Sequence, residues 1–303
     1  KRSGIAPLIS IAGILLALSA GSFFFTPDRA FSENENRYLQ LTPKLTWDRI
    51  LSGDFMEDME DYTSDQILLR DFWTASRSVL QRAEGKEDIS GTYLGAEGRY
   101  FTKTTDDSFD RAGLEKNAGY IRDFLDAGGK GGTALIVPSP AGILRDMLPE
   151  SAPYYDEAGA FDLLRGTLGT ALLDVRQTLS AVEDPYYHTD HHWTTMGAQA
   201  AYLRWAEDTG HTARRYELTL ATDHFRGTLF SKVLLPDSVY DSVYYAPEVT
   251  VSSVVCDGEE GALYDMAALE EKDKYKLFLG GNYGQCVITT GVENGEHLLL
   301  VKD

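Results

Sequence analysis

Short apolar runs that alternate with helical patterns are the feature that most constrains what this chain can fold into. Four such runs occur, at residues 133–137, 171–175, 275–279 and 296–301. Patterns typical of amphipathic helices precede the first two runs, at 113–127 and 160–170. Glycines and Pro138 bound the first run, which is typical of a parallel strand covered on both faces. The alternation predicts an α/β fold.

Residues 5–25 carry no charge and are 21 residues long, which is enough for a helix to span a bilayer. Lys1 and Arg2 precede this stretch and predict that the N-terminus stays inside the cell while the body lies outside. A cleaved signal peptide, with Ala20-Gly21-Ser22 as a weak cleavage site, is the alternative hypothesis. The sequence thus predicts a signal anchor or a secreted protein.

The remaining chain divides by pattern into two parts. Residues 26–110 are expected to form a tether, a helix from Leu51, a second helix with Ser64 or Asp65 as its N-cap, and a hairpin at 93–101. Residues 111–303 are expected to form the α/β domain, with inserted β structure at about 216–255.

Charge excludes one class of partner. The net charge is −19, and because Lys1 and Arg2 precede the apolar stretch, the rest of the chain carries −21. A body this acidic repels phosphate backbones, so we expect no nucleic-acid binding. Cys256 and Cys286 are too few for a disulfide framework, and the sequence leaves open whether they pair.

The densest group of ionisable side chains lies within Tyr186–Thr195 (YYHTDHHWTT). Asp190 and His192 are two residues apart, so in an extended segment both side chains project to the same side. A carboxylate that orients an imidazole is the arrangement that activates a serine nucleophile. A helix that opens near Thr194 or Thr195 and stops at Gly210 is expected to hold this segment in place.

Two other hypotheses stay open for the same residues. His188, Asp190 and His192 alternate and offer three ligands of the kind that zinc accepts, although the spacing differs from the helical H-E-x-x-H pattern. The histidines are alternatively structural groups, hydrogen-bonded at the entry of a helix. Ser139 and the segment Arg226-Gly227-Thr228 are weaker candidates, each read more simply as part of a turn.

The segment YYHTDHHWTTMGAQAAY resembles the signature of the DHHW family of bacterial cell-surface proteins, which are related to the SGNH-hydrolase-like domains of alginate O-acetylation proteins. Further similar segments are Phe31-Ser32-Glu33 with Glu35-Asn36-Arg37, Asp65-Gln66 with Arg70-Asp71, Tyr93-Leu94-Gly95, Val137-Pro138, Arg226–Leu229, Phe278–Asn282 and Leu298–Asp303. One departure is His188, where the family more often has arginine.

The resemblance implies a three-layer SGNH-like fold with a permuted motif order and a Ser-His-Asp mechanism. By it, Asp190 orients His192, His192 is the general base, and His191 occupies a variable position. The family's nucleophilic serine would be the residue directly after Asp303, so this sequence is expected to be a fragment that stops just before it.

The resemblance also implies that Gly281 and Asn282 stabilise an oxyanion. Trp193 is a candidate platform for a sugar. The resemblance further implies acetyl transfer or hydrolysis on a cell-surface glycan. It implies no metal or organic cofactor, and a membrane acyl-donor protein as partner. The rival functions are a non-catalytic glycan-binding or assembly protein and a metal-dependent hydrolase.

Overall fold

The computed structural model describes residues 27–129 and 131–302, together with Ile9, Ser10, Gly13, Ile14, Ala17 and Gly21. Most of the predicted anchor at 5–25 lies outside these residues. Among the residues described, no helix combines the length and apolar character that crossing a membrane requires. The chain forms two compact units. Unit 1 contains the described residues up to Lys103 with Leu148–Ala152 and Thr228–Val239, and unit 2 contains the rest.

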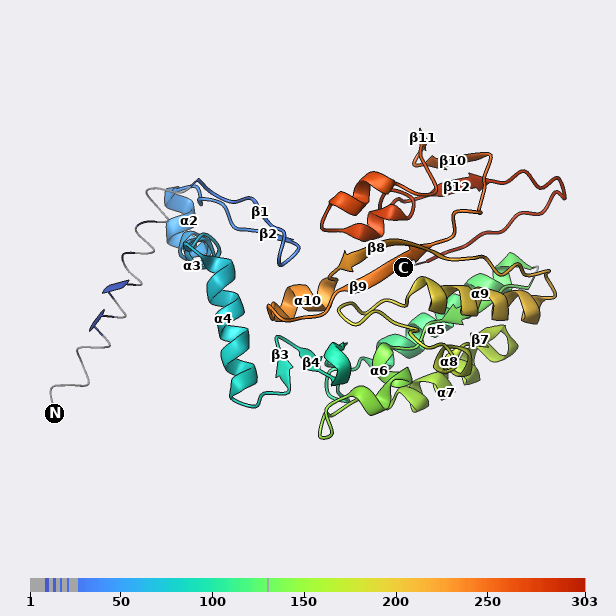
Figure 1. Ribbon diagram of the computed structural model, residues 1–303, viewed down its shortest axis with the longest axis horizontal. Coiled ribbons are helices and arrows are strands. Elements are labelled where there is room, and N and C mark those ends of the chain that lie inside the picture. Colours follow the sequence, from blue (N-terminus) through green and yellow to red (C-terminus); the bar gives the residue numbers. More distant parts are fainter. Residues whose placement is uncertain are drawn as a thin grey trace. The chain divides into compact units, whose positions relative to one another are not determined.

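Unit 1 joins small strands to helices. Its elements are β1 (Phe31–Ser32), β2 (Arg37–Tyr38), α2 (Trp47–Ser52), α3 (Asp54–Asp65), α4 (Arg70–Ala83), β3 (Asp88–Ile89), β4 (Thr92–Leu94), η1 (Ala96–Gly98), β5 (Tyr100–Thr102) and α10 (Thr228–Val233) (Figure 1). Strands β3, β4 and β5 form an antiparallel sheet, and the predicted hairpin at 93–101 is confirmed as β4 and β5. Ile89 and Tyr100 pack with Leu229, Val233 and Leu235 from the distant α10 segment to form the core.

The predicted N-cap at Ser64 or Asp65 is wrong, because α4 begins five residues later, at Arg70, after Leu69 in a left-handed conformation (φ 60°). The reason is that Ser64 and Asp65 are the last two residues of α3, and Asp65 also belongs to an ion-pair network. Its carboxylate accepts from the guanidinium of Arg37 and from the backbone N–H of Gln40, so it is not available as a cap. Arg70 then pairs with Glu35 and with Asp65. The network joins two of the segments on which the family resemblance rests.

Unit 2 is a mixed α/β body. Its elements are α5 (Arg111–Gly128), β6 (Ala134–Ile136), α6 (Pro140–Ile143), η2 (Arg145–Met147), α7 (Glu157–Leu168), η3 (Gly169–Ala171), β7 (Leu172–Asp174), α8 (Arg176–Ser180), α9 (Thr195–Thr209), β8 (Thr219–Phe225), β9 (Asp241–Tyr245), β10 (Ser253–Cys256), β11 (Glu259–Glu260), η4 (Met266–Glu270), η5 (Lys274–Leu277) and β12 (Cys286–Thr289). The first two predicted strands are confirmed as β6 and β7, which pair in parallel.

Helices cover both faces of this parallel pair, as a strand's alternation of side chains requires. Ala134 and Ile136 pack into a cluster with α5 and α7. Leu135, between them in sequence, packs instead into a cluster with residues of α8 and α9, on the other face. Figure 1 shows these helices gathered around β7. The predicted α/β class is therefore confirmed.

The third and fourth apolar runs do not form the predicted strands. Residues 274–277 form the 3₁₀ helix η5, which Asp273 caps by accepting from the N–H of Tyr275 (3.2 Å). A short apolar run fits a buried helical turn as well as a strand, and here Leu277 is fully buried. No strand is assigned to 296–301, and Leu298 to Val301 are exposed.

The expected β structure at about 216–255 contains the antiparallel pair β8 and β9 and the start of β10. The helix α10 interrupts it and belongs to unit 1. Cys256 and Cys286 lie opposite each other on β10 and β12 and form a disulfide, which settles the pairing that the sequence left open. The predicted boundary between residues 110 and 111 stays a prediction, because compactness does not measure independent folding.

Candidate active site

The segment Tyr186–Trp193 is a closed loop fixed at both ends. Tyr186 pairs with Trp193 in an isolated antiparallel bridge, and the N–H of Tyr187 donates to the carbonyl of His192 (3.2 Å). The hydroxyl of Tyr186 donates to the carbonyl of Pro138 (2.6 Å), which ties the loop to the segment after β6. Thr194 caps the following helix by accepting from the N–H of Gly197 (3.2 Å). The predicted helix from Thr194 or Thr195 to Gly210 is confirmed as α9.

Asp190 and His192 form the pair that the sequence predicts. Asp190 is fully buried, and its Oδ1 lies 2.5 Å from Nδ1 of His192 and 3.0 Å from the backbone N of His192. A carboxylate only accepts hydrogen bonds, so Nδ1–H is the donor and Nε2 keeps its lone pair. The His192 side chain is 47% exposed, so Nε2 belongs to a side chain that solvent reaches. This is the geometry of an oriented general base.

His191 lies beside the same carboxylate. Its Nδ1 is 3.7 Å from Oδ1 of Asp190, and the rings of His191 and His192 have centroids 4.0 Å apart. Ligand atoms of Asp190, His191 and His192 lie within 4.8 Å of one another, so these three residues, and not His188, form the group that can hold a metal ion. The sequence proposed His188, Asp190 and His192 as metal ligands, and the structure does not bring these three together.

His188 instead contacts a second buried carboxylate, that of Asp241 at the start of β9. Oδ1 of Asp241 accepts from the backbone N–H of His188 (2.7 Å) and lies 3.1 Å from Nδ1 of the same residue. Oδ2 accepts from the N–H (2.9 Å) and the hydroxyl (2.6 Å) of Thr189. Asp241 is only 4% exposed, and these hydrogen bonds hold the loop immediately before Asp190.

Gly227 completes the support. Its N–H donates to Oγ1 of Thr189 (3.0 Å), and a Cβ built on Gly227 would lie 2.2 Å from Oδ2 and 2.3 Å from Cβ of Asp190. Only a glycine allows the backbone to approach the carboxylate this closely. The neighbouring Arg226, a weaker candidate from the sequence, lies with its guanidinium over the ring of Tyr240 (3.9 Å).

Aromatic rings flank the base. The ring of Tyr275 lies 4.8 Å from that of His192 and contacts Tyr187 and Phe225 edge to face. Burial raises the pKa of Tyr275, and the charge of Asp190 adds to the effect. Its hydroxyl oxygen is buried and has no hydrogen-bond partner among the described residues. Tyr275 therefore stays protonated and places an aromatic surface against the base.

The other predicted residues lie in different settings. Trp193 packs in the core cluster of α8 and α9 and is partly buried. Gly281 (φ 151°) and exposed Asn282 lie in the turn after η5, the element whose Tyr275 touches His192. Ser139 caps α6 by accepting from the N–H of Gly142 (3.0 Å). The predicted oxyanion and sugar-platform roles stay predictions.

Two residues of the site, Tyr275 and Asp241, were not predicted from the sequence, and Gly227 was named only within a weaker candidate segment. Gly227 lies in a segment that the family resemblance includes, so its position had a signal although its contact did not. Tyr275 was read as part of a strand, and this concealed its contact with His192. Asp241 had no signal, because a lone aspartate in a β-rich stretch does not reveal which distant backbone groups it accepts from.

Comparisons with known proteins agree with this architecture. A structure of a DHHW family protein from Eubacterium siraeum matches with a TM-score of 0.53 at 19% identity, over 69% of this chain and 74% of that chain. PatB1 of Bacillus cereus matches with a TM-score of 0.51 at 16% identity, over 64% and 74% of the two chains. The O-acetyltransferase domain of AlgJ from Pseudomonas putida gives a TM-score of 0.40 at 22% identity, over 51% and 63%. The likenesses to the DHHW family protein and to PatB1 show the fold alone, and the AlgJ match carries no argument.

No curated protein sequence matches the chain. The family model described as "SGNH hydrolase-like domain, acetyltransferase AlgX" matches residues 96–269, which is more than half of the chain and includes Asp190, His191 and His192. The resemblance read from the sequence motif is thereby confirmed. The chain belongs to the family of SGNH hydrolase-like domains of the acetyltransferase AlgX type.

Proposed function

We propose that this protein is a cell-surface carbohydrate O-acetyltransferase or acetylesterase that uses a Ser-His-Asp mechanism. The observation that carries the proposal is the buried Asp190 carboxylate, 2.5 Å from Nδ1 of the half-exposed His192. The family membership supports the acetyl-transfer chemistry, because the family model is named for an acetyltransferase.

In this mechanism Nε2 of His192 takes the proton of a serine hydroxyl as the serine oxygen attacks the acetyl carbonyl carbon. Asp190 stabilises the imidazolium that forms. The imidazolium then returns its proton to the leaving oxygen, and an acetyl-serine remains. A sugar hydroxyl or a water molecule, deprotonated by the same nitrogen, attacks the acetyl carbon. The bond from the acetyl carbon to the serine oxygen then breaks, and the imidazolium returns its proton to that oxygen, which frees the serine. By the resemblance, the nucleophile is a serine directly after Asp303.

Other parts of the proposal rest on the sequence. Gly281 and Asn282 would stabilise the oxyanion, and His191 and Trp193 would contact the substrate. The stretch at 5–25 would anchor the protein in the membrane, with the body outside the cell and a membrane acyl-donor protein as partner. The fold would be three-layered, with a permuted motif order.

The test uses a chain that includes the serine expected after Asp303. We expect this chain to release 4-nitrophenol from 4-nitrophenyl acetate or to acetylate an oligosaccharide acceptor, measured by mass spectrometry. His192→Ala should lower kcat by about 10⁴-fold, and Asp190→Asn by a similar factor. His224→Ala is the matched control, because His224 also hydrogen-bonds an aspartate, Asp223, but both side chains are exposed.

Activity that survives His192→Ala would refute the catalytic assignment. If the unsubstituted protein and His192→Ala both bind glycan and neither has activity, the result would instead favour a non-catalytic glycan-binding or assembly protein.

A metal-dependent hydrolase is the second candidate, favoured by the grouping of Asp190, His191 and His192. The variant His191→Ala separates the two mechanisms. If a metal is required, this substitution removes both the bound metal, measured by elemental analysis, and the activity. In the serine mechanism His191 contacts only the substrate, so its loss is expected to raise KM while kcat persists, and a chelator has no effect.

A further inference from the structure

Unit 1 contains a pocket of about 560 Å³ whose lining is positively charged, whereas the chain as a whole is negatively charged. The protein has 28 basic and 47 acidic residues, yet the pocket is lined by four cationic side chains and one carboxylate. The lining residues are Glu35, Arg37, Ser64, Ile67, Arg70, Trp73, Thr74, Arg77, Ser90, Ser231, Lys232 and Leu234. All twelve belong to unit 1, which contains none of Asp190, His191 and His192.

Two of the four cations are already neutralised. Arg37 donates to Glu35 (2.8 Å) and to Asp65, and Arg70 pairs with the same two carboxylates, one of which lies just outside the lining. Two guanidinium groups therefore balance two carboxylates. The charges of Arg77 and Lys232 are left over, since no ion pair is recorded for either within residues 27–129 and 131–302.

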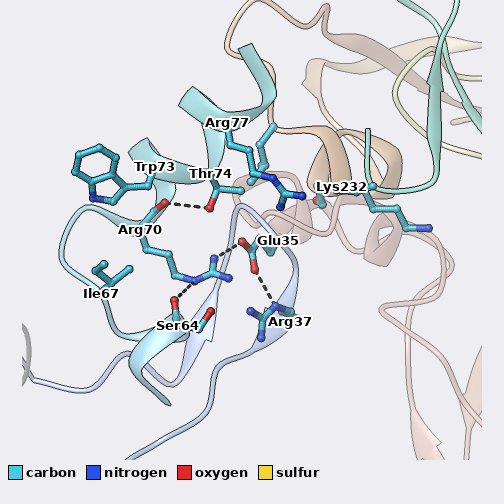
Figure 2. Close-up of a pocket in the computed structure, with 12 residues that line it drawn as sticks. Glu35, Arg37, Ser64, Ile67, Arg70, Trp73, Thr74, Arg77 and Lys232 are labelled. Carbon is cyan, nitrogen blue, oxygen red and sulfur yellow. Dashed lines mark hydrogen bonds and ion pairs between the residues drawn. The ribbon is translucent and has the colours of Figure 1, made fainter. Parts of the chain in front are cut away.

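Figure 2 shows how these charges lie. Arg77 extends from α4 toward Glu35 and the guanidinium of Arg70, so its own guanidinium faces the interior of the pocket. Arg77 follows Arg70 by seven residues, which places both on the same face of the helix. Lys232, on the opposite wall, turns its ammonium group away from this cluster. Arg77 is thus the cation that can bind a ligand directly.

The uncharged lining suits a hydroxylated molecule. Four side chains in it carry hydroxyl groups, namely Ser64, Thr74, Ser90 and Ser231, and Trp73, 40% exposed, also belongs to the lining. Aromatic rings offer an apolar face to the C–H groups of a sugar ring, and a guanidinium matches carboxylate and phosphate oxygens in pairs. The volume is within the range of sites that hold small organic ligands.

We propose that this pocket binds a sugar-sized molecule that carries one carboxylate or phosphate group, with Arg77 as its main anchor. The inference does not depend on the acetyl-transfer mechanism. A protein of net charge −19 repels small anions from most of its surface, so saturable anion binding identifies a local site.

The experiment is isothermal titration calorimetry of the full chain at low salt with glucuronate, glucose 6-phosphate, glucose and inorganic phosphate. We expect at least one of the two anionic sugars to bind with a dissociation constant of about 1 mM or below, and glucose to bind at least about tenfold more weakly. Whichever anionic sugar binds more tightly identifies the oxyanion. Added salt should weaken binding, because the contact is ionic.

Variants assign the site. Arg77→Gln should weaken binding about tenfold, the scale of one charge-assisted pair, and Lys232→Gln should weaken it less. Arg82→Gln is the matched control, since Arg82 lies on the same helix but pairs with Asp237 outside the pocket. Equal losses in Arg77→Gln and Arg82→Gln would overturn the site, as would equal binding of glucose. Binding of inorganic phosphate with neither anionic sugar would overturn the saccharide assignment.

Discussion

The contact between Asp241 and the loop before Asp190 leads to a sharp prediction for Asp241→Asn. The carboxylate accepts from two donors at each oxygen, on His188 and on Thr189. An amide of the same shape keeps only one acceptor oxygen. Whichever way it turns, its NH₂ group faces at least one backbone N–H of the loop, so a buried donor loses its partner.

The magnitude follows from these contacts. One buried N–H without an acceptor costs about 1–3 kcal/mol, and the remaining bonds each lose roughly 1 kcal/mol because the acceptor is no longer charged. We expect Asp241→Asn to lower the free energy of unfolding by about 3–5 kcal/mol, against a total of about 5–15 kcal/mol for a typical domain. The assay is urea unfolding at pH 7, followed by circular dichroism.

Asp162→Asn is the control for this measurement. Asp162 is 75% exposed and pairs with Arg165 on the surface of α7, so its substitution should cost at most about 1 kcal/mol. If Asp241→Asn costs no more than this control, Asp241 does not hold the loop and the reasoning fails.

Three further predictions follow from other contacts. Gly227→Ala places a Cβ 2.3 Å from that of Asp190, so we expect a loss of about 3 kcal/mol in urea unfolding and a fall in esterase activity; an unchanged midpoint would contradict the close approach. Burial opposes ionisation of Asp65, but its bonds to Arg37 hold the pKa of Asp65 below the ordinary 3.8. The stabilisation from ionised Asp65 is therefore complete above pH 3.8 and is lost as the pH falls through the lower pKa of the folded state. Asp65→Asn should flatten the acid limb of a curve of unfolding free energy against pH. An acid limb identical to that of the unsubstituted protein would refute the prediction. Reduction of the disulfide, which spans 30 residues, should lower the free energy of unfolding by about 3–4 kcal/mol, and an unfolding curve unaffected by dithiothreitol would count against it.

The sequence predicted local features of the fold better than its long-range ones. The hairpin at β4 and β5, the individual strands β6 and β7, and the helix α9 each follow from local sequence patterns. The strand predicted for the third apolar run was wrong, because a short apolar run can be buried in an aromatic cluster equally well as a helical turn or as a strand.

The candidate site divides in the same way. Asp190 and His192 are two residues apart, so their pairing could be read from spacing alone. The supports of the pair come from 37 and 51 residues beyond Asp190, at Gly227 and Asp241, and depend on which buried donors lie within reach after folding. No local pattern encodes that information.

The core of unit 1 has a consequence for the order in which the protein can be made. Ile89 and Tyr100 are buried by Leu229, Val233 and Leu235, which leave the ribosome about 130 residues later. Unit 1 therefore cannot complete its core until most of unit 2 has been synthesised. During this time its apolar surface is exposed to aggregation and to chaperone binding. Residues 27–103 expressed alone would lack five of the seven buried residues of this core cluster, whereas the same residues joined to 228–239 by a short linker would carry all seven.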